Sequence, residues 1–191
     1  MRIKGRWKVG YVLDYHTVRS EFLGYDELGH AKFDTTYTEI GELLYKHKYK
    51  SDRSATKTIA REASDFIKNT WQLEVDLVVP VPPTKVRSPQ PLFLLAEALA
   101  GFLGASFTTS AVKPRKRMPQ LKDIGEYDRR LEILKNAYSV DRSKVEGLRV
   151  LLFDDLYRSG ATMEAVTQAL YEEGGAKTAF GFAITRTRSK I

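Results

Sequence analysis

The stretch that decides the fold is Leu151-Leu152-Phe153-Asp154-Asp155-Leu156-Tyr157-Arg158-Ser159-Gly160-Ala161-Thr162. Its apolar residues followed by two carboxylates predict a buried strand that ends at Asp154 and Asp155. Gly160 lets the backbone turn tightly before a helix begins. Backbone N–H groups at such a helix start, with the hydroxyls of Ser159 and Thr162, suit a phosphate. Because adjacent carboxylates can accept hydrogen bonds from vicinal hydroxyls, the stretch predicts a site for a phosphorylated sugar.

Direct hydrogen bonds from this loop, more than the helix dipole, are expected to hold the phosphate. A dipole contributes roughly 0.3–1 kcal/mol at an exposed site, whereas each hydrogen bond to a charged oxygen contributes about 1.5–3 kcal/mol. An apolar strand ending in two aspartates also occurs in receiver-like domains and in the magnesium-binding strand of P-loop NTPases. A P-loop enzyme further requires G-x-x-x-x-G-K-[ST], and the sequence contains no such run.

Strands and helices alternate on both sides of this stretch. Hydrophobic spacing predicts strands over 75–81 and 180–184 and helices over 40–47, 59–67, 92–103 and 163–170. This alternation predicts a parallel sheet with helices on both faces. Ligands of such folds bind at the carboxyl ends of the strands. The loop after Pro80 and the carboxylate of Asp154 are therefore expected at one edge of the sheet.

The first 38 residues lack the alternation of strands and helices that the rest of the chain shows. Residues 7–38 read as β-rich, and a hairpin turn is expected over 24–29. We expect a cap, or hood, beside the core. Asp14 and His16 could contact an acceptor there, but a solvated hairpin face is the favoured reading. Lysines 46, 48 and 50 with Arg53 are expected on a solvated helix surface.

Two basic segments could neutralise an anionic ligand. Residues 84–88 include Lys85 and Arg87, which can crowd N–H donors around a pyrophosphate. Residues 113–117 hold four cations in five positions, and Pro114 and Pro119 argue against a helix there. A ligand-closing loop, an ordinary surface loop and a nucleic-acid patch remain open for this second segment.

Composition narrows the classes of function. The chain has 191 residues, a formal charge of +7, 42% hydrophobic residues and no cysteine. It fits one domain with a small appendage, and disulfides and thiolate metal sites are excluded. No run of about 18 apolar residues occurs, so no membrane span is expected, and a cytoplasmic location is compatible. The positive charge suits a phosphorylated ligand and nucleic acid equally.

Residues 151–162 resemble the 5-phosphoribosyl-1-pyrophosphate (PRPP) motif of type I phosphoribosyltransferases. The chain from Ile40 to Arg186 resembles the ComF-like branch of that family. Its landmarks follow the family's order, namely Glu42-Leu43-Leu44-Tyr45-Lys46-His47-Lys48-Tyr49, Asp76-Leu77-Val78-Val79-Pro80-Val81-Pro82, Gln120, Arg130, Ala137-Tyr138 and the PRPP motif. The resemblance implies an α/β fold, a type I phosphoribosyltransferase-like parallel sheet flanked by helices with a small N-terminal β-rich hood. The hood would be residues 1–38 and the core domain 39–191.

The resemblance also implies a role for each motif. Asp154 and Asp155 would be the catalytic pair that binds the ribose hydroxyls of PRPP. The 5′-phosphate would be held by Arg158, Ser159, Gly160, Ala161 and Thr162, and the pyrophosphate by Lys85 and Arg87. A mobile loop within 113–136 would carry Arg115, Lys116, Arg117, Gln120 and Arg130. Mg²⁺ would bind together with PRPP, largely through the ligand's own oxygens, with no direct protein ligand.

The activity implied is transfer of a 5-phosphoribosyl group to an unidentified nucleobase or amine, with release of pyrophosphate. Arg158 stands where many relatives have Thr or Asp, and Ile133 where ComF-like proteins often have Asn. These departures keep open a PRPP- or nucleotide-sensing protein without turnover. A ComF-like adaptor in DNA uptake is a third reading, with nucleic acid or a DNA-processing protein as partner. A homodimer is a further possibility, and the sequence offers no strong candidate for a general base.

Overall fold

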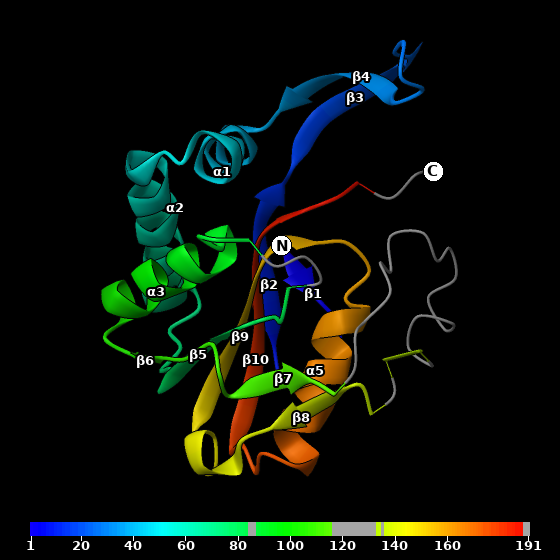
Figure 1. The fold of residues 1–191 in the computed structure, drawn as a ribbon. Coiled ribbons are helices and arrows are strands. Elements are labelled where there is room, and N and C mark those ends of the chain that lie inside the picture. Colours follow the sequence, from blue (N-terminus) through cyan, green and yellow to red (C-terminus); the bar gives the residue numbers. More distant parts are fainter. Residues whose placement is uncertain (84–86, 116–132, 135, 189–191) are drawn as a thin grey trace.

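A mostly parallel sheet forms the centre of the computed structural model (Figure 1), which describes residues 1–83, 87–115, 133–134 and 136–188. Its six strands follow the order β1-β2-β10-β9-β5-β6. The parallel members are β2 (Gly10–Tyr15), β5 (Leu77–Pro80), β6 (Ser106–Phe107), β9 (Arg149–Tyr157) and β10 (Thr178–Arg186), and β1 (Arg2–Ile3) is antiparallel to β2. The predicted α/β class is confirmed.

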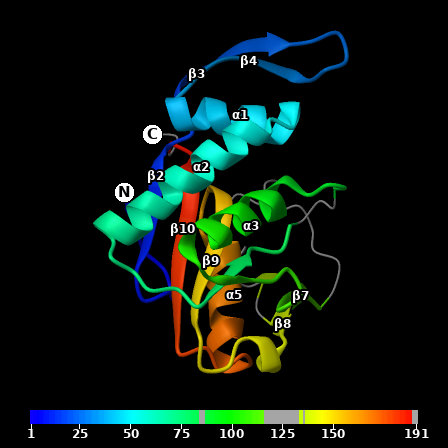
Figure 2. The same ribbon diagram turned by 90° about the vertical axis from the view of Figure 1, so that its left-hand side faces the viewer.

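Helices cover both faces of the sheet. Figures 1 and 2 show α1 (Glu39–Lys50), α2 (Arg53–Asp65) and α3 (Pro91–Leu103) on one face and α5 (Ala161–Glu172) on the other. A π-helical turn, η1 (Phe66–Thr70), follows α2, and a 3-10 turn, η3 (Arg142–Lys144), precedes β9. The predicted helix over 92–103 is confirmed, and it ends at Gly104 in the left-handed conformation, φ 71°.

Alternate residues of β9 pack into two separate cores. Leu151 and Phe153 belong to the cluster beneath α1, α2 and α3, whereas Val150 and Leu152 belong to the cluster beneath α5. All four side chains are fully buried. A strand buried on both faces is apolar at every position, which explains the uninterrupted apolar run in the sequence.

The first 38 residues are divided between the sheet and a separate hairpin. Strand β2 pairs in parallel with β10, so it is part of the central sheet. Strands β3 (Thr17–Tyr25) and β4 (Ala31–Tyr37) form a two-stranded hairpin that stands out from the body in both ribbon views. Only this hairpin is left to form the expected hood. Its turn contains a Gly29 N–H to Asp26 carbonyl hydrogen bond of 3.0 Å.

Strand β9 does not end at the two carboxylates, and that prediction was wrong. It continues to Tyr157, because β10 is equally long and pairs Ala183 with Asp154 and Arg186 with Tyr157. The ladder with β10 therefore carries the strand past the change from apolar to charged residues. A second two-stranded antiparallel sheet, of β7 (Val112–Pro114) and β8 (Tyr138–Val140), lies beside α5. None of the helices in the described ranges is both long and apolar enough to cross a membrane.

Candidate active site

Asp154 and Asp155 lie at the carboxyl end of β9 and face different surroundings. The backbone N–H of Asp155 donates to Oδ1 of Asp154 at 2.8 Å. Burial, and then the charge of Asp155, raise the pKa of Asp154 to about 7. On the same side, burial and the charge of Asp154 raise the pKa of Tyr138 to about 12. Asp154 is therefore a carboxyl group that changes protonation near neutral pH.

Asp155 is paired with a lysine from the first helix. Nζ of Lys48 lies 2.8 Å from Oδ2 of Asp155, and the two side chains are only 19% and 15% exposed. The expectation that Lys48 belongs to a solvated face was wrong, whereas Lys46 is on the surface and pairs with Glu42 at 2.9 Å. The sequence does not distinguish Lys48 from Lys46, because both are lysines of one basic helix. They differ only in which side of the helix carries them.

The start of α1 fixes the position of Lys48. The hydroxyl of Thr38 accepts the N–H of Gly41 at 3.1 Å, which caps the helix, and donates to the carbonyl of Tyr15 at 2.6 Å. A Cβ on Gly41 would lie 2.0 Å from the carbonyl oxygen of His16. Gly41 thus allows the helix to approach β2 closely enough for Lys48 to reach Asp155.

The amino end of α5 presents the predicted phosphate loop. Gly160 precedes the helix with φ 79°, and none of the side chains that the structure describes caps this helix start. The N–H of Ala161 has only a long contact of 3.5 Å with Oγ of Ser159. Arg158 is exposed, and Ser159 and Thr162 are partly buried. Free N–H groups at a helix start form an anion site, and this one begins at Ala161, shortly after β9 ends at Tyr157.

Arg186, at the end of β10, was not predicted. Its guanidinium lies 5.8 Å from the ring centre of Tyr15 and 6.0 Å from that of Tyr157. The Nε atom is buried and has no hydrogen-bond partner among the described residues. The Tyr157 ring also packs over Gly160, where a Cβ would lie 2.5 Å from the Tyr157 hydroxyl. An unpaired cationic donor therefore stands at the same edge as the phosphate loop.

His16 also lies at this edge, between β2 and β3. Its Nδ1 is 3.2 Å from the hydroxyl of Thr185, and its ring meets Tyr37 edge-on at 5.3 Å. Asp14 is exposed, and its Oδ1 accepts the N–H of the adjacent Tyr15 at 2.7 Å. The structure therefore brings His16, and not Asp14, toward the carboxylates.

The remaining predicted residues are placed only in part. Lys85, Lys116, Arg117, Gln120 and Arg130 lie outside the described residues. Arg87 is exposed after the carboxyl end of β5. Arg115 is not at the carboxylates, because it pairs with Glu173 beyond the far end of α5 and donates from Nε to the Tyr138 carbonyl at 3.1 Å.

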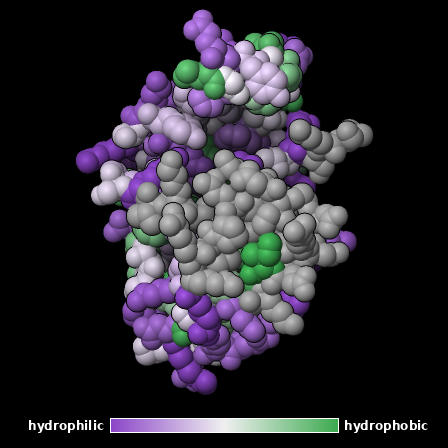
Figure 3. Space-filling model, turned by 45° about the vertical axis from the view of Figure 1, so that its right-hand side comes forward, coloured by the Kyte–Doolittle hydropathy of each residue, from purple (hydrophilic) through white to green (hydrophobic). Residues whose placement is uncertain are grey.

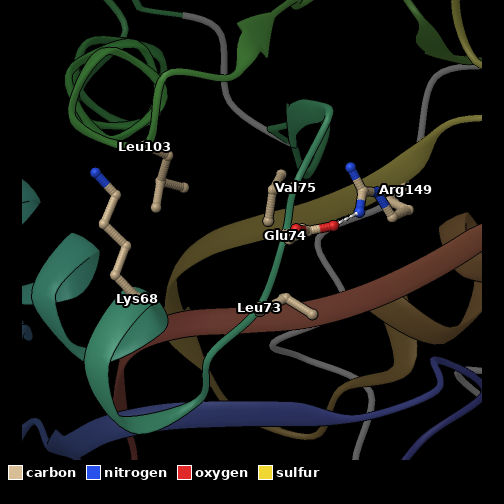
Figure 4. A pocket seen from close by; sticks show the side chains of 6 residues that line it. All are labelled: Lys68, Leu73, Glu74, Val75, Leu103 and Arg149. Carbon is tan, nitrogen blue, oxygen red and sulfur yellow. Dashed lines mark hydrogen bonds and ion pairs between the residues drawn. The ribbon is translucent and has the colours of Figure 1, made fainter.

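A cavity of about 340 Å³ lies at the opposite edge of the sheet (Figure 4). It is lined by Lys68, Leu73, Glu74, Val75, Leu103 and Arg149. Its cations are already engaged, because Lys68 donates to the Phe102 carbonyl at 2.6 Å and Arg149 pairs with Glu74 and Asp76. It borders the amino ends of β5 and β9, so it is separate from the carboxylate edge.

Two curated proteins resemble the chain in sequence, and no family model matches it. The competence protein ComFC of Bacillus subtilis (strain 168) is 24% identical over 153 residues, which is 80% of this chain and 62% of that protein. An adenine phosphoribosyltransferase of Bifidobacterium longum (strain DJO10A) is 35% identical over 94 residues, which is 48% of this chain and 46% of that protein. The chain thus spans about half to three fifths of the length of these relatives.

Solved structures of phosphoribosyltransferases are also similar at low identity. Glutamine PRPP amidotransferase from B. subtilis gives a TM-score of 0.49 at 17% identity, covering 83% of this chain and 34% of that one. Adenine phosphoribosyltransferase from Saccharomyces cerevisiae gives 0.48 at 14%, covering 86% and 83%. Both scores are below 0.5, so they carry no argument about function. In sequence the chain is similar to a competence protein ComFC and to an adenine phosphoribosyltransferase, and its motif at 151–162 lies at the carboxyl edge of a parallel sheet.

Proposed function

We propose that this protein binds Mg²⁺–PRPP and transfers its 5-phosphoribosyl group to a nucleobase or amine, with release of pyrophosphate. One observation carries the proposal: Asp154 and Asp155, near the carboxyl end of β9, and the start of α5 that follows this strand lie at one edge of the sheet. Carboxylates accept hydrogen bonds from ribose hydroxyls, and free N–H groups take the 5′-phosphate. The two sites are joined by one short loop, as the two ends of a ribose 5-phosphate require.

Each group of residues has a distinct role in the proposed reaction. Asp154 and Asp155 bind the ribose, and Arg158 to Thr162 enclose the 5′-phosphate. Arg87, with Lys85, offers positive charge to the pyrophosphate. The unpaired Nε of Arg186 is a further donor for an anionic oxygen at this edge. Breaking the C1′–O bond creates oxocarbenium character, so the protein mainly has to orient the sugar and stabilise the departing pyrophosphate.

The residues present fit a magnesium ion that arrives with its ligand. Among the described residues, no group of three or more histidine, aspartate or glutamate side chains could form a metal cage by itself. Mg²⁺ keeps several waters and binds substrate phosphates rather than all-protein cages, so the ion would be held largely by the oxygens of PRPP, as the resemblance implies. When bound, the ion would neutralise charge on the pyrophosphate.

Lys48 must release or share Asp155 when the ribose binds. The ion pair of 2.8 Å already occupies one oxygen of this carboxylate. It also holds helix α1, which follows the β3–β4 hairpin, against the PRPP motif. Binding of the ribose would therefore change the contact between Asp155 at the sheet edge and Lys48 on α1, the helix that follows the hairpin expected to form the hood.

The test is thermal unfolding with and without PRPP, each with and without Mg²⁺. At a PRPP concentration near one hundred times Kd, the expected stabilisation is about 2.7 kcal/mol, or roughly 5–11 °C for a chain of this size. Pyrophosphate and ribose 5-phosphate serve as ligand controls and should give smaller shifts. Pyrophosphate release with adenine and with ammonium then tests for turnover.

Matched variants decide where the ligand binds. Asp154→Asn with Asp155→Asn should abolish the Mg²⁺-dependent shift. Glu21→Gln with Asp34→Asn removes the same charge from the exposed hairpin and should retain the shift. Absence of a shift in the unaltered protein at millimolar PRPP would refute the proposed function. A shift without pyrophosphate release would reduce it to sensing.

A role beside DNA is the second candidate, and the formal charge of +7 together with the competence relative favours it. Positive charge raises association with any polyanion. Retention of single- or double-stranded DNA at low salt, with a steep loss as salt rises, would support direct binding. Failure to retain either form at low ionic strength would exclude it.

A further inference from the structure

The backbone of His16 is held in place by hydrogen bonds on both sides. The N–H of His16 donates to the Arg186 carbonyl at 2.8 Å, and its carbonyl accepts the N–H of Thr38 at 3.3 Å. These bonds tie the residue to the end of β10 and to the cap of α1. The side chain is therefore anchored at the carboxyl edge of the sheet, although its neighbours in sequence lead into an exposed hairpin.

The hydrogen bonds of Thr185 determine which ring nitrogen of His16 carries the proton. The Thr185 hydroxyl donates to the backbone carbonyl of Asp155 at 3.2 Å. A hydroxyl has a single proton, so toward Nδ1 of His16, 3.2 Å away, the same oxygen can only accept. Neutral His16 must then be protonated at Nδ1. Thr185 is fully buried, so water does not compete for this hydrogen bond.

This tautomer leaves Nε2 with a lone pair. Among the described residues, Nε2 of His16 has no hydrogen-bond partner. A neutral imidazole oriented through its other nitrogen is a common arrangement for a general base. The connection runs from His16 through Thr185 to the backbone of Asp155, which belongs to the proposed ribose pair.

Burial and nearby positive charge favour the neutral form of the His16 ring. Burial, and then the positive charge of Lys48, lower the pKa of His16, and Arg158 acts in the same direction. Asp155 opposes them by raising it. The ring of Tyr37 also packs against the His16 ring. Below the lowered pKa the ring gains a proton and its lone pair is lost, so a reaction that uses Nε2 must fail at acid pH.

We propose that His16 is the general base that removes the proton from the acceptor nitrogen during phosphoribosyl transfer. As the acceptor nitrogen bonds to C1′, the C1′–O bond breaks and its electron pair leaves on pyrophosphate. The N–H proton of the acceptor passes to Nε2 of His16, which becomes an imidazolium. The inference rests on the proposed function and narrows the acceptor class to a nucleobase or amine that carries an N–H group.

Two measurements separate this inference from the function on which it rests. Two-bond ¹H–¹⁵N NMR spectra of the protein without ligand report the tautomer of each histidine, and the chain has three. Neutral His16 should show a protonated Nδ1 and an unprotonated Nε2, and Thr185→Val should remove this preference whereas Thr185→Ser retains it. A protonated Nε2 in the unaltered protein overturns the inference, whatever PRPP does.

The second measurement is pyrophosphate release from saturating Mg²⁺–PRPP with adenine or ammonium. His16→Ala should lower kcat about 10²–10⁴-fold, keep the PRPP-induced thermal shift and lose the acid limb of the kcat–pH profile. Added imidazole should restore part of the rate. His30→Ala, in the exposed turn of the hairpin, is the control and should leave the rate unchanged. Unchanged kcat in His16→Ala with intact PRPP binding overturns the inference alone, whereas loss of PRPP binding in the unaltered protein refutes the proposed function.

Discussion

Asp154 is the residue at which stability and the proposed function conflict. Its carboxyl is buried beside a second carboxylate, and both effects raise its pKa to about 7. A site for ribose hydroxyls requires the charged form, whereas the folded chain without ligand favours the protonated form. Bound hydroxyl donors or Mg²⁺ would favour the charged form. The structure thus keeps a carboxyl group whose charged form is unfavourable until a ligand compensates for it.

Replacing Asp154 by Asn should therefore stabilise the free protein, in a pH-dependent way. The folded pKa of about 7 lies above the ordinary value of 3.8, so the contribution of this group is fully present at low pH and is lost as pH rises through about 7. At pH 8 we expect Asp154→Asn to raise the free energy of unfolding by roughly 2–4 kcal/mol. Near pH 4 the difference should vanish. Urea unfolding at both pH values measures it.

The exposed Asp34 provides the comparison for this variant. Asp34→Asn removes the same charge from the hairpin, where the side chain is 53% exposed, and should change stability little at either pH. If Asp154→Asn is less stable than the unaltered protein at pH 8, the raised pKa does not describe the folded state.

At the residue scale, the sequence identifies groups that are adjacent in the chain and misses those joined by folding. Asp154, Asp155 and the loop to Thr162 could be expected at one edge of the sheet, because one strand and one turn place them. Lys48, Thr185 and Arg186 could not, because they reach the site from α1 and β10. A lysine in a basic helix looks like any solvated lysine until the partner that buries it is known.

At the element scale, the turn from β9 into α5 depends on one glycine. Gly160 has φ 79°, and the ring of Tyr157 occupies the space that a Cβ would need. Gly160→Ala should lower stability by about 1–3 kcal/mol through backbone strain and this contact. It should also weaken the PRPP-induced thermal shift, because the N–H groups of the loop would move. Urea unfolding and the PRPP shift measure the two effects.

A substitution at Gly147 is the control that distinguishes the effect of backbone strain from the effect of the contact with Tyr157. Gly147 has φ 73°, and no atom of the described residues lies within 4 Å of its added Cβ. Gly147→Ala should show the strain alone and leave the PRPP shift intact. If Gly160→Ala and Gly147→Ala lower the free energy of unfolding equally, the Tyr157 ring moves aside at little cost and the turn tolerates a side chain.

Helices and strands with strong local sequence patterns could be predicted. Where a strand ends, however, depends on the strand that pairs with it. The helix predicted over 92–103 is observed as Pro91–Leu103, because a glycine stop and an apolar surface are both local features. The end of β9 was misplaced because β10, formed some thirty residues later, extends the ladder to Tyr157. A change from apolar to charged residues therefore does not by itself mark the end of a strand.

At the scale of the whole molecule, the sequence predicted the layers but not how the first 38 residues divide. The alternation in β2 was read as part of a hood, whereas β2 extends the sheet beside β10. Alternation describes a strand with one covered face, and it does not reveal which sheet the strand joins. The β3–β4 hairpin that remains combines exposed apolar and charged residues, visible at the top of Figure 3.

This hairpin should loosen without affecting the stability of the body. Phe22 and Phe33 are directly paired across its strands, with ring centres 5.5 Å apart, and both are more than half exposed. Such a pair contributes roughly 0.2–1 kcal/mol, and an isolated two-stranded hairpin is only marginally stable. Phe22→Ser with Phe33→Ser should therefore speed hydrogen exchange of the hairpin amides. The melting temperature of the body should stay within about 2 °C, since local opening can occur without global unfolding.

Tyr37, at the base of the same hairpin, should behave differently. Its ring lies 5.3 Å from that of His16 and 5.5 Å from that of Tyr45 on α1. Tyr37→Ser should therefore alter the NMR signals of the His16 ring, whereas the double substitution at Phe22 and Phe33 should leave them unchanged. If the double substitution shifts the His16 signals or lowers the melting temperature as much as Tyr37→Ser does, the hairpin and the sheet edge unfold as one unit. The hairpin would then be part of the site's framework and not a separate arm.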